Sequence, residues 1–488
     1  MKSQFSVLGS QFPASICLKT NPSVVLSGAE SSRNELSVES KDPYPLNKFV
    51  RSGRPRPRPL LLVLLMISVA LSPSAFSQDK PIALKNAQLL TITHGVIENG
   101  TIVLQAGKIA AVGTNVSIPA NAQIVDATGM TIYPGLIDSE TRLGLTEISA
   151  EQMTNDLVEL SDEIMPHMHT SEAFHAESAL IPVARMNGIT NAIIAPDNED
   201  TLPGQDSFIQ LDGASASEML LIRDLAMPLN FTGDQRRNKG PFEKRKFPST
   251  RMGLAAQLRQ AFLDAQDYKA KWAEYDRKKA DAERDKKSPP APPKHDLKSE
   301  ALLPYLEGKK TIVLAVEGPS DLETAVNLAN EFHLKFVLNH ISHLQPVLDY
   351  VATLKVPVIV GPIYEAPKED ERYDTVFKLP AELHKRGVKI AFASYSAHNV
   401  RNLPDAAGYA TAFGLPYNEA LKAITLNPAE IWGVADKLGS LDVGKTANIV
   451  VANGDPLDVK TDVKQVYIEG RVVPMTSRQV WLKNQYSK

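Results

Sequence analysis

The chain contains 488 residues and a single cysteine, Cys17. Cys17 lies within the first 77 residues, which a predicted export signal would remove, so the mature chain has no cysteine. That absence excludes disulfide bonds, a thiol nucleophile and zinc held by cysteine. Any metal ion in this protein must therefore be bound by His, Asp, Glu or a modified Lys.

An excess of charge of one sign is also absent. The chain has 53 basic and 56 acidic residues, so its net charge of −3 provides no basic field that would attract a nucleic acid. Apolar residues make up 43% and charged residues 22%, which is typical of a globular protein with a sizeable core. The length suits one large domain with a smaller one beside it.

The apolar run near the N-terminus falls short of a membrane span. It extends from Leu60 to about Leu71, roughly 12 residues where ~20 are needed. Four arginines precede it, and the small residues Ala75 and Ser77 suit a signal-peptidase site. We interpret residues 1–77 as an N-terminal extension and secretory signal, with a membrane anchor as the alternative.

Removal of that segment leaves 44 basic and 52 acidic residues, a net charge of −8. We therefore expect an acidic exported protein, periplasmic in a Gram-negative host, with no stable membrane span after cleavage.

Short runs rich in Val and Ile recur through the middle of the chain, with helical patterns between them. The clearest runs are TNAIIAP (190–196), KTIVLAV (310–316), LKFVLNH (334–340), VPVIVGPI (356–363) and VKIAFAS (388–394). Buried strands that alternate with helices predict an α/β fold with a parallel sheet, and eight such units close a TIM-like (β/α)8 barrel. Both ends of the chain instead show short strands between turns.

One segment does not follow this alternation of strands and helices. Residues 250–287 have the pattern of one long helix whose second half is crowded with charge, and SPPAPP (288–293) ends it. We interpret 250–293 as a charged helical insertion that projects into solvent. The alternative is an arm that docks the protein to a larger assembly.

Two motifs resemble those of the amidohydrolase superfamily, in its imidazolonepropionase-like branch. PGLIDSETR (134–142) is similar to the motif at the family's first barrel strand, and NEALKAITLNPAEIWGVADKLGSLDVGKTANIVVANGDPL (418–457) is similar to its closing block. The resemblance implies a small β-sandwich domain built from residues 78–137 and 431–488, with a TIM-like barrel over 138–430. It also implies a hydrolase acting on non-peptide carbon–nitrogen bonds.

In that family, histidines and an aspartate at the strand ends hold a metal ion that activates water. The matching positions in this chain are Glu140 and Arg142 on the first strand, Ala315 on the fifth, His340 on the sixth and Tyr395 on the eighth. Only His340 keeps the family's residue, and a guanidinium such as that of Arg142 has no free lone pair to offer a cation. The resemblance therefore implies a hydrolase with a degraded metal site.

The sequence allows more than one arrangement of Glu140, Arg142 and His340. Glu140 and Arg142 lie two positions apart, so both point to the same strand face and are expected to form a buried ion pair, unless one of them faces solvent in the barrel mouth. His340 is either a core histidine or, together with His398 and Glu140, part of a substitute zinc site. We assign no other cofactor.

Other polar residues are weaker candidates. The sequence MPHMH (165–169), His175 and His343 favour loops at the active face, and the acidic stretch 197–207 favours a solvated loop. Asp138 more often caps a strand end than takes part in catalysis.

Two functional hypotheses follow from the sequence. The first is an exported hydrolase of small amides or cyclic amides with a degraded metal site. The second is a catalytically inactive relative, or pseudoenzyme, that binds a small molecule or a partner protein. A homo-oligomer is compatible with either hypothesis.

Overall fold

Two eight-stranded sheets organise the computed structural model, which describes residues 80–159, 161–231, 247–341, 343–364, 366–367 and 371–487. The described residues belong to one compact unit. The predicted extension and export signal, residues 1–77, lie outside the described residues. Among the residues that are described, no helix is both long and apolar enough to cross a membrane.

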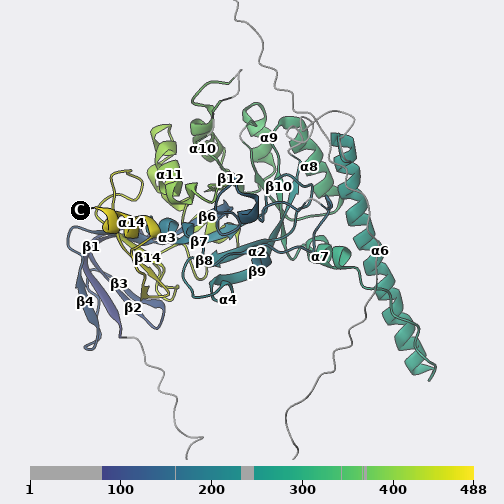
Figure 1. Ribbon diagram of the computed structural model, residues 1–488, viewed down its shortest axis with the longest axis horizontal. Coiled ribbons are helices and arrows are strands. Elements are labelled where there is room, and N and C mark those ends of the chain that lie inside the picture. The colour runs from purple at the N-terminus through teal and green to yellow at the C-terminus, as the bar shows by residue number, and fades with distance from the viewer. Residues whose placement is uncertain are drawn as a thin grey trace, which may run out of the picture. The chain divides into compact units, whose positions relative to one another are not determined.

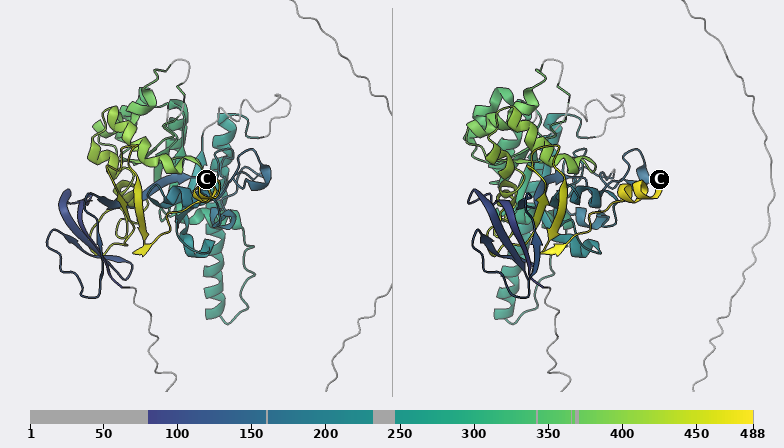
Figure 2. Two further views of the ribbon diagram at one scale, coloured as in Figure 1. Left: turned by 60° about the vertical axis from the view of Figure 1, so that its left-hand side comes forward. Right: turned by 90° about the vertical axis from the view of Figure 1, so that its left-hand side faces the viewer.

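The first sheet joins the two ends of the chain. Its strand order is β16-β15-β14-β5-β1-β2-β3, with β4 also paired to β1, and β14 runs antiparallel to β5. Figure 2 shows the early strands beside the late ones. The strands are β1 (Ile82–Leu90), β2 (Val96–Gln105), β3 (Lys108–Gly113), β4 (Gln123–Asp126), β5 (Thr131–Pro134), β14 (Ile449–Ala452), β15 (Val463–Ile468) and β16 (Arg471–Val472).

Alternating apolar residues on these strands form a separate small core. Leu84, Leu89, Ile102, Ile132 and Ile449 are buried together within it. The period-two pattern of the sequence therefore places one face of each strand inside, and the β-rich domain built from both chain ends is confirmed.

The second sheet is the nearly closed barrel. Its order is β13-β12-β11-β10-β9-β8-β7-β6, and the backbone N–H of Tyr395 donates to the Glu140 carbonyl at 3.0 Å where its two ends meet. The strands are β6 (Leu136–Thr141), β7 (Ile189–Ile194), β8 (Asp206–Gln210), β9 (Leu220–Asn230), β10 (Thr311–Ala315), β11 (Phe336–Asn339), β12 (Val358–Val360) and β13 (Ile390–Phe392). The predicted TIM-like barrel is confirmed.

One strand departs from the parallel sheet that the sequence predicts. β8 runs antiparallel to both β7 and β9. The segment that joins β8 to β9, residues 211–219, is shorter than the dozen or so residues that a parallel crossover requires. The chain therefore turns back on itself at this point.

Helices cover the barrel on the outside (Figure 1). They are α2 (Thr170–Ala173), α3 (Leu180–Arg185), α4 (Ala216–Met219), α6 (Arg251–Arg284), α7 (Leu297–Leu306), α8 (Pro319–Glu331), α9 (Leu348–Thr353), α10 (Thr375–Lys385), α11 (Leu403–Ala412), α12 (Tyr417–Lys422) and α13 (Leu426–Ile431). The C-terminal helix α14 (Arg478–Tyr486) buries no residue. Single 3₁₀ turns occur at Gln152–Thr154, Gln345–Val347 and Asn399–Asn402.

The long helix predicted from residue 250 is α6. The Thr250 side chain caps it by accepting from the Gly253 N–H at 3.0 Å. Its buried residues, Leu254, Leu258, Phe262, Ala265 and Tyr268, are spaced three or four apart, so they form one face, which packs beside α7 and α8.

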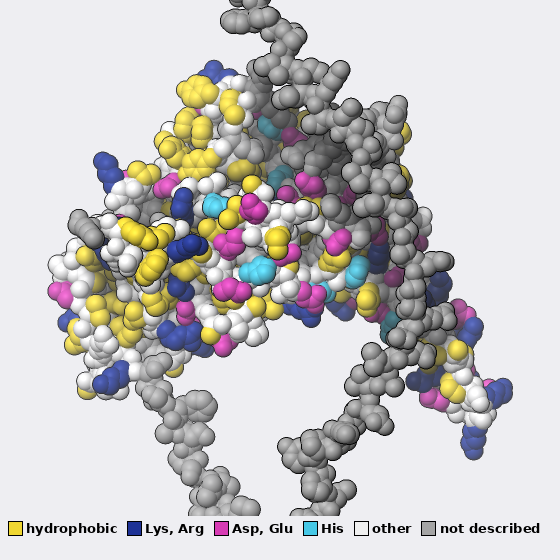
Figure 3. All heavy atoms as spheres, viewed as in Figure 1, with side chains coloured by type: hydrophobic (Ala, Val, Ile, Leu, Met, Phe, Trp, Pro, Cys, Tyr) yellow, Lys and Arg dark blue, Asp and Glu magenta, His cyan; other side chains and the backbone are white. Residues whose placement is uncertain are grey.

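The rest of α6, beyond Tyr268, buries no residue and projects away from the barrel (Figure 1). Its surface is covered with Lys, Arg, Asp and Glu side chains (Figure 3). The sequence therefore predicted the projecting half correctly, whereas the first half belongs to the helical layer of the barrel.

Candidate functional site at the barrel mouth

The barrel interior is layered. An apolar layer fills its middle, contributed by Ile137, Ile193, Phe208, Ala226, Val313, Val337, Ile359 and Ala393. Side chains on a strand alternate between its two faces, so residues two or four positions nearer the carboxyl ends of the parallel strands also point inward. That next layer includes Asn230, Ala315, Asn339 and Tyr395, and because β8 runs the opposite way its residue in this layer is Asp206. A polar mouth therefore lies above an apolar floor.

Glu140 and Arg142 form the ion pair that the sequence predicts. Arg142 Nη1 lies 2.8 Å from Glu140 Oε1, and the two residues are 5% and 4% exposed. Asp197, from the loop after β7, adds a longer contact of 3.9 Å to Arg142 Nη2. The guanidinium thus occupies the mouth as a buried, compensated cation.

Asn339 joins this pair to Tyr395. The Asn339 amide donates to Glu140 Oε2, and the Tyr395 hydroxyl donates to Asn339 Oδ1. His340 Nε2 lies 3.6 Å from Glu140 Oε1 and accepts from the Asn198 amide at 2.6 Å. Residues at the ends of three strands, together with one loop, therefore form one hydrogen-bonded network.

His340 and Tyr395 share an unusual backbone conformation. Their φ angles are +55° and +52°, in the left-handed region that bulky residues rarely adopt, and their rings lie 4.2 Å apart between centroids. Backbone strain of this kind clusters at functional sites, where the surrounding structure maintains it. The strand ends are thus shaped to hold these two side chains over the mouth.

The carboxyl groups of the mouth differ in acidity. Burial alone would raise the pKa of Glu140, but the charge of Arg142 and the contact with His340 outweigh it and lower that pKa to about 2. Burial raises the pKa of Asp138 to about 7, against the opposing effect of hydrogen bonds from Ser394. Glu140 is therefore ionised at neutral pH, whereas Asp138 keeps its proton to a much higher pH than an ordinary aspartate.

Burial also raises the pKa of Tyr395 well above its ordinary value, and the charge of Glu140 adds to this. Tyr395 therefore stays a neutral phenol. Its hydroxyl donates a hydrogen bond and offers no anionic oxygen to a cation.

The other candidate residues, Ala315, His398 and His343, lie at or beyond the ends of the barrel strands. Ala315 ends β10, the fifth barrel strand, and His398 is exposed beyond β13. Among the described residues no interaction joins His398 to Glu140 or His340. His343 lies between two carboxylates, with Nδ1 2.7 Å from Glu371 Oε1 and Nε2 3.8 Å from Glu317 Oε1.

Two of the three histidines in the 165–175 region have acidic partners, whereas the buried Nδ1 of His167 has no hydrogen-bond partner among the described residues. His169 Nδ1 is 2.6 Å from Asp224 Oδ1, and His175 Nε2 is 3.0 Å from Asp156 Oδ2. Figure 3 shows His side chains interspersed with acidic ones across this face.

Sequence reasoning missed Asn339, Asn198 and Asn230, and it placed Asp206 in a solvated loop although this residue is buried in β8. Asn339 bridges Glu140 and Tyr395, and Asn198 contacts His340. Their signal in the sequence was only adjacency, since Asn339 precedes His340 and Asn198 lies in the acidic loop.

These side chains do not suit the metal ion that the family resemblance implies. A guanidinium and a neutral phenol stand at two of the five positions, an alanine stands at a third, and the Glu140 oxygens are already hydrogen-bonded. Within the described part of the chain, no three His, Cys, Asp or Glu side chains are grouped so as to hold a metal.

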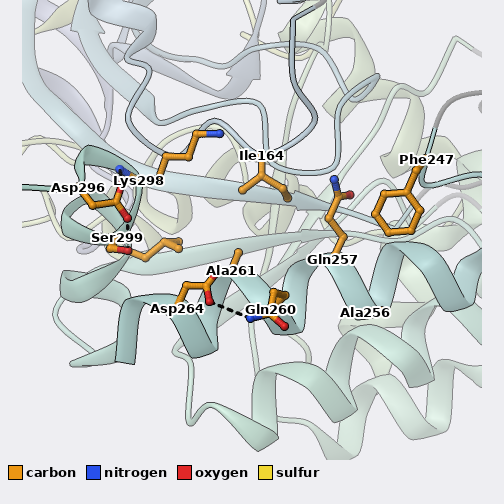
Figure 4. Close-up of a pocket in the computed structure, with 11 residues that line it drawn as sticks. Ile164, Phe247, Ala256, Gln257, Gln260, Ala261, Asp264, Asp296, Lys298 and Ser299 are labelled. Atoms are coloured by element: carbon orange, nitrogen blue, oxygen red, sulfur yellow. Dashed lines mark hydrogen bonds between the residues drawn. The ribbon is translucent and has the colours of Figure 1, made fainter. Parts of the chain in front are cut away.

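A cavity of about 420 Å³ lies away from the mouth, between α6 and α7 beside Ile164 and Phe247 (Figure 4). Several of its polar side chains already pair with one another or with a neighbour. Asp264 accepts from the Gln260 amide at 2.8 Å, and Lys298 contacts Asp162. Some of the polar side chains that line this cavity are therefore already hydrogen-bonded or ion-paired and are less available to a ligand.

A barrel joined to a β-rich domain that both chain ends build defines a class of composite hydrolase-fold proteins. Residues 317–473 match the model of the Amidohydrolase family. A crystal structure of an amidohydrolase from Thermotoga maritima MSB8 is 30% identical, with a TM-score of 0.72 over 81% of this chain and 100% of that one. The chain belongs to the amidohydrolase family, and this membership supports a hydrolase-type function on carbon–nitrogen bonds.

Curated relatives match over more limited lengths. Amidohydrolase tasK of Hapsidospora irregularis is 26% identical over 393 residues, which are 76% of this chain and 39% of that protein. Imidazolonepropionase of Geobacillus sp. is 38% identical over 84 residues, covering 13% of this chain and 20% of the enzyme. The chain thus spans less than half the length of each of these two proteins.

Proposed function

We propose that this amidohydrolase-family protein binds a small amide or cyclic amide at its barrel mouth without a metal ion. The observation that carries the proposal is the buried Arg142–Glu140 pair, which occupies the two positions where the family resemblance places first-strand metal ligands. A buried guanidinium repels a dication and donates hydrogen bonds, so it suits a carbonyl oxygen better than a metal.

Metal analysis tests this proposal directly. The purified chain, dialysed against buffer containing zinc and then against metal-free buffer, is expected to retain much less than one zinc per chain. Stoichiometric zinc, together with amide hydrolysis that a chelator abolishes, would show instead that the mouth works as a metal hydrolase.

Metal-independent hydrolysis of a carbon–nitrogen bond is the second candidate. It is favoured by Asp138, because a carboxyl group with a pKa of about 7 can exchange a proton near neutral pH. Turnover of N-acyl amino acids or cyclic imides in the presence of a chelator would support this candidate. The absence of turnover, alongside measurable binding of the same compounds, would favour the binding protein.

We further propose that the protein is exported. The charged, apolar and small-residue segments of residues 51–77 support this, although they lie outside the described residues. N-terminal sequencing of the mature protein from a periplasmic fraction is expected to begin near Gln78. A cytoplasmic protein that retains residues 20–45 would refute the proposal.

A further inference from the structure

Two acceptor atoms in the mouth layer have no hydrogen-bond donor. Asp206 and Asn230 are each 1% exposed, and neither Asp206 Oδ1 nor Asn230 Oδ1 has a partner among the residues that the structure describes. The Asn230 amide nitrogen is committed, because it donates to the Asp200 carbonyl at 2.7 Å. Buried acceptors of this kind are uncommon in folded proteins, so each one calls for an explanation.

Both side chains face the barrel interior. Asp206 lies two residues before Phe208, which belongs to the apolar floor, and Asn230 lies four residues after Ala226 of the same floor. Burial raises the pKa of Asp206 well above its ordinary value, the charge of Glu140 adds to this, and the charge of Arg142 opposes it. The free acceptors therefore adjoin the network that fills the rest of the mouth.

Further carboxyl groups lie around the mouth. Arg142 and Glu140 compensate each other, whereas Asp197, Glu317 and Glu371 add further carboxylates at the ends and loops of the same strands. A ligand that brings positive charge would be attracted to this region, and its N–H groups would supply the donors that Asp206 and Asn230 lack.

We infer that the mouth recognises a small amide that also carries a cationic N–H group, either an ammonium or a guanidinium, with Asp206 and Asn230 as its acceptors. This inference rests on the proposed function, because it names the ligand class of the same site. The amide carbonyl would face the donors of the network, and the cation would face the two free oxygens. Asn198, which contacts His340, stands at the entrance.

Matched probes test the inference. N-acetylputrescine and acetylagmatine carry the cation, and N-pentylacetamide has the same chain with a methyl group in place of the ammonium. Isothermal titration of the full chain is expected to show cationic probes binding at least about tenfold more tightly than the neutral probe, as expected for a charge-assisted hydrogen bond.

Asp206→Asn removes the ionisable carboxyl group and keeps the shape of the side chain. We expect this variant to lose the preference for cationic probes while it still binds N-pentylacetamide. The matched control is Asp405→Asn on α11, a carboxyl outside the barrel mouth, which should leave the preference intact. The comparison of probes on the unaltered chain does not depend on either variant folding.

Each result decides a different point. Equal affinity for cationic and neutral amides would overturn the inference and leave the proposed function standing. A preference for cationic probes that persists in Asp206→Asn would also overturn the inference, because a group other than Asp206 would then bind the ligand's cation. Failure of every amide to bind would overturn both the inference and the proposed function.

Discussion

The Arg142 guanidinium lies 2.8 Å from the Glu140 carboxylate, with both side chains buried at the mouth of the barrel. Asn339 holds the second oxygen of that carboxylate. A charge pair at these positions is self-compensating, so the mouth needs no dication to balance Glu140. The same arrangement makes each partner dependent on the other.

A double-mutant cycle measures that dependence. Removing one partner of a buried ion pair typically costs ~3–5 kcal/mol, since the other is left buried and unpaired. We therefore expect Arg142→Ala to lower the free energy of unfolding more than Arg142→Ala combined with Glu140→Ala. Urea denaturation provides the measurement.

The exposed pair of Arg386 with Glu382 is the control for this cycle, because exposed pairs contribute only ~0–1 kcal/mol. Additive effects at Glu140 and Arg142 would show that the two side chains do not stabilise each other.

Restoring imidazoles should restore metal affinity. The double variant Glu140→His with Arg142→His places two histidines at the end of β6, near His340. We expect it to bind more zinc than the unaltered chain does, because three neutral imidazoles are suitable ligands. Equilibrium dialysis with metal analysis compares the two proteins, and the single variant Glu140→His, which keeps Arg142, should gain little.

The pH dependence of stability should report on Asp138. Its pKa is raised from 3.8 to about 7 by folding, so the folded chain holds a proton that the unfolded chain has released over this range. Stability contributed by this group is therefore present at low pH and falls as pH rises from about 4 to 7, by up to ~1.4 kcal/mol per pH unit.

Asp138→Asn should remove this component, because its side-chain oxygen can still accept from the Ser394 and Glu140 N–H groups. Thermal melts of both proteins between pH 5 and 8 would reveal it. Parallel slopes in the two proteins would contradict the assignment.

The projecting half of α6 should be dispensable for folding. Replacing residues 276–290 with a short Gly-Ser linker removes no buried side chain, so the expected change in unfolding free energy is within about 0.5 kcal/mol. Phe262→Ala, in the buried half and packed on Phe332, should cost ~3–5 kcal/mol. A large loss of stability from the linker variant would mean that the projecting half packs on the barrel.

Much of the fold was accessible from short-range patterns. The Val- and Ile-rich runs marked barrel strands such as β10 and β13, and residues 250–287 marked one long helix, although its first half packs on the barrel instead of projecting into solvent. These signals are local because a buried strand or helix face requires apolar residues at a fixed period. The reversal of β8 was not foreseen, since strand direction depends on pairing between distant residues.

The amino-acid sequence by itself determined which chemical groups stand at the strand ends: a guanidinium, a phenol, one imidazole and carboxylates, in a chain whose single cysteine is Cys17. Only the tertiary structure decided how those groups pair. It brought Asn339 to both Glu140 and Tyr395, and it left Asp206 and Asn230 facing the barrel interior without donors. The physical reason is that hydrogen bonds and ion pairs depend on distances of a few ångströms between residues that lie far apart along the chain, and closure of the barrel sets those distances.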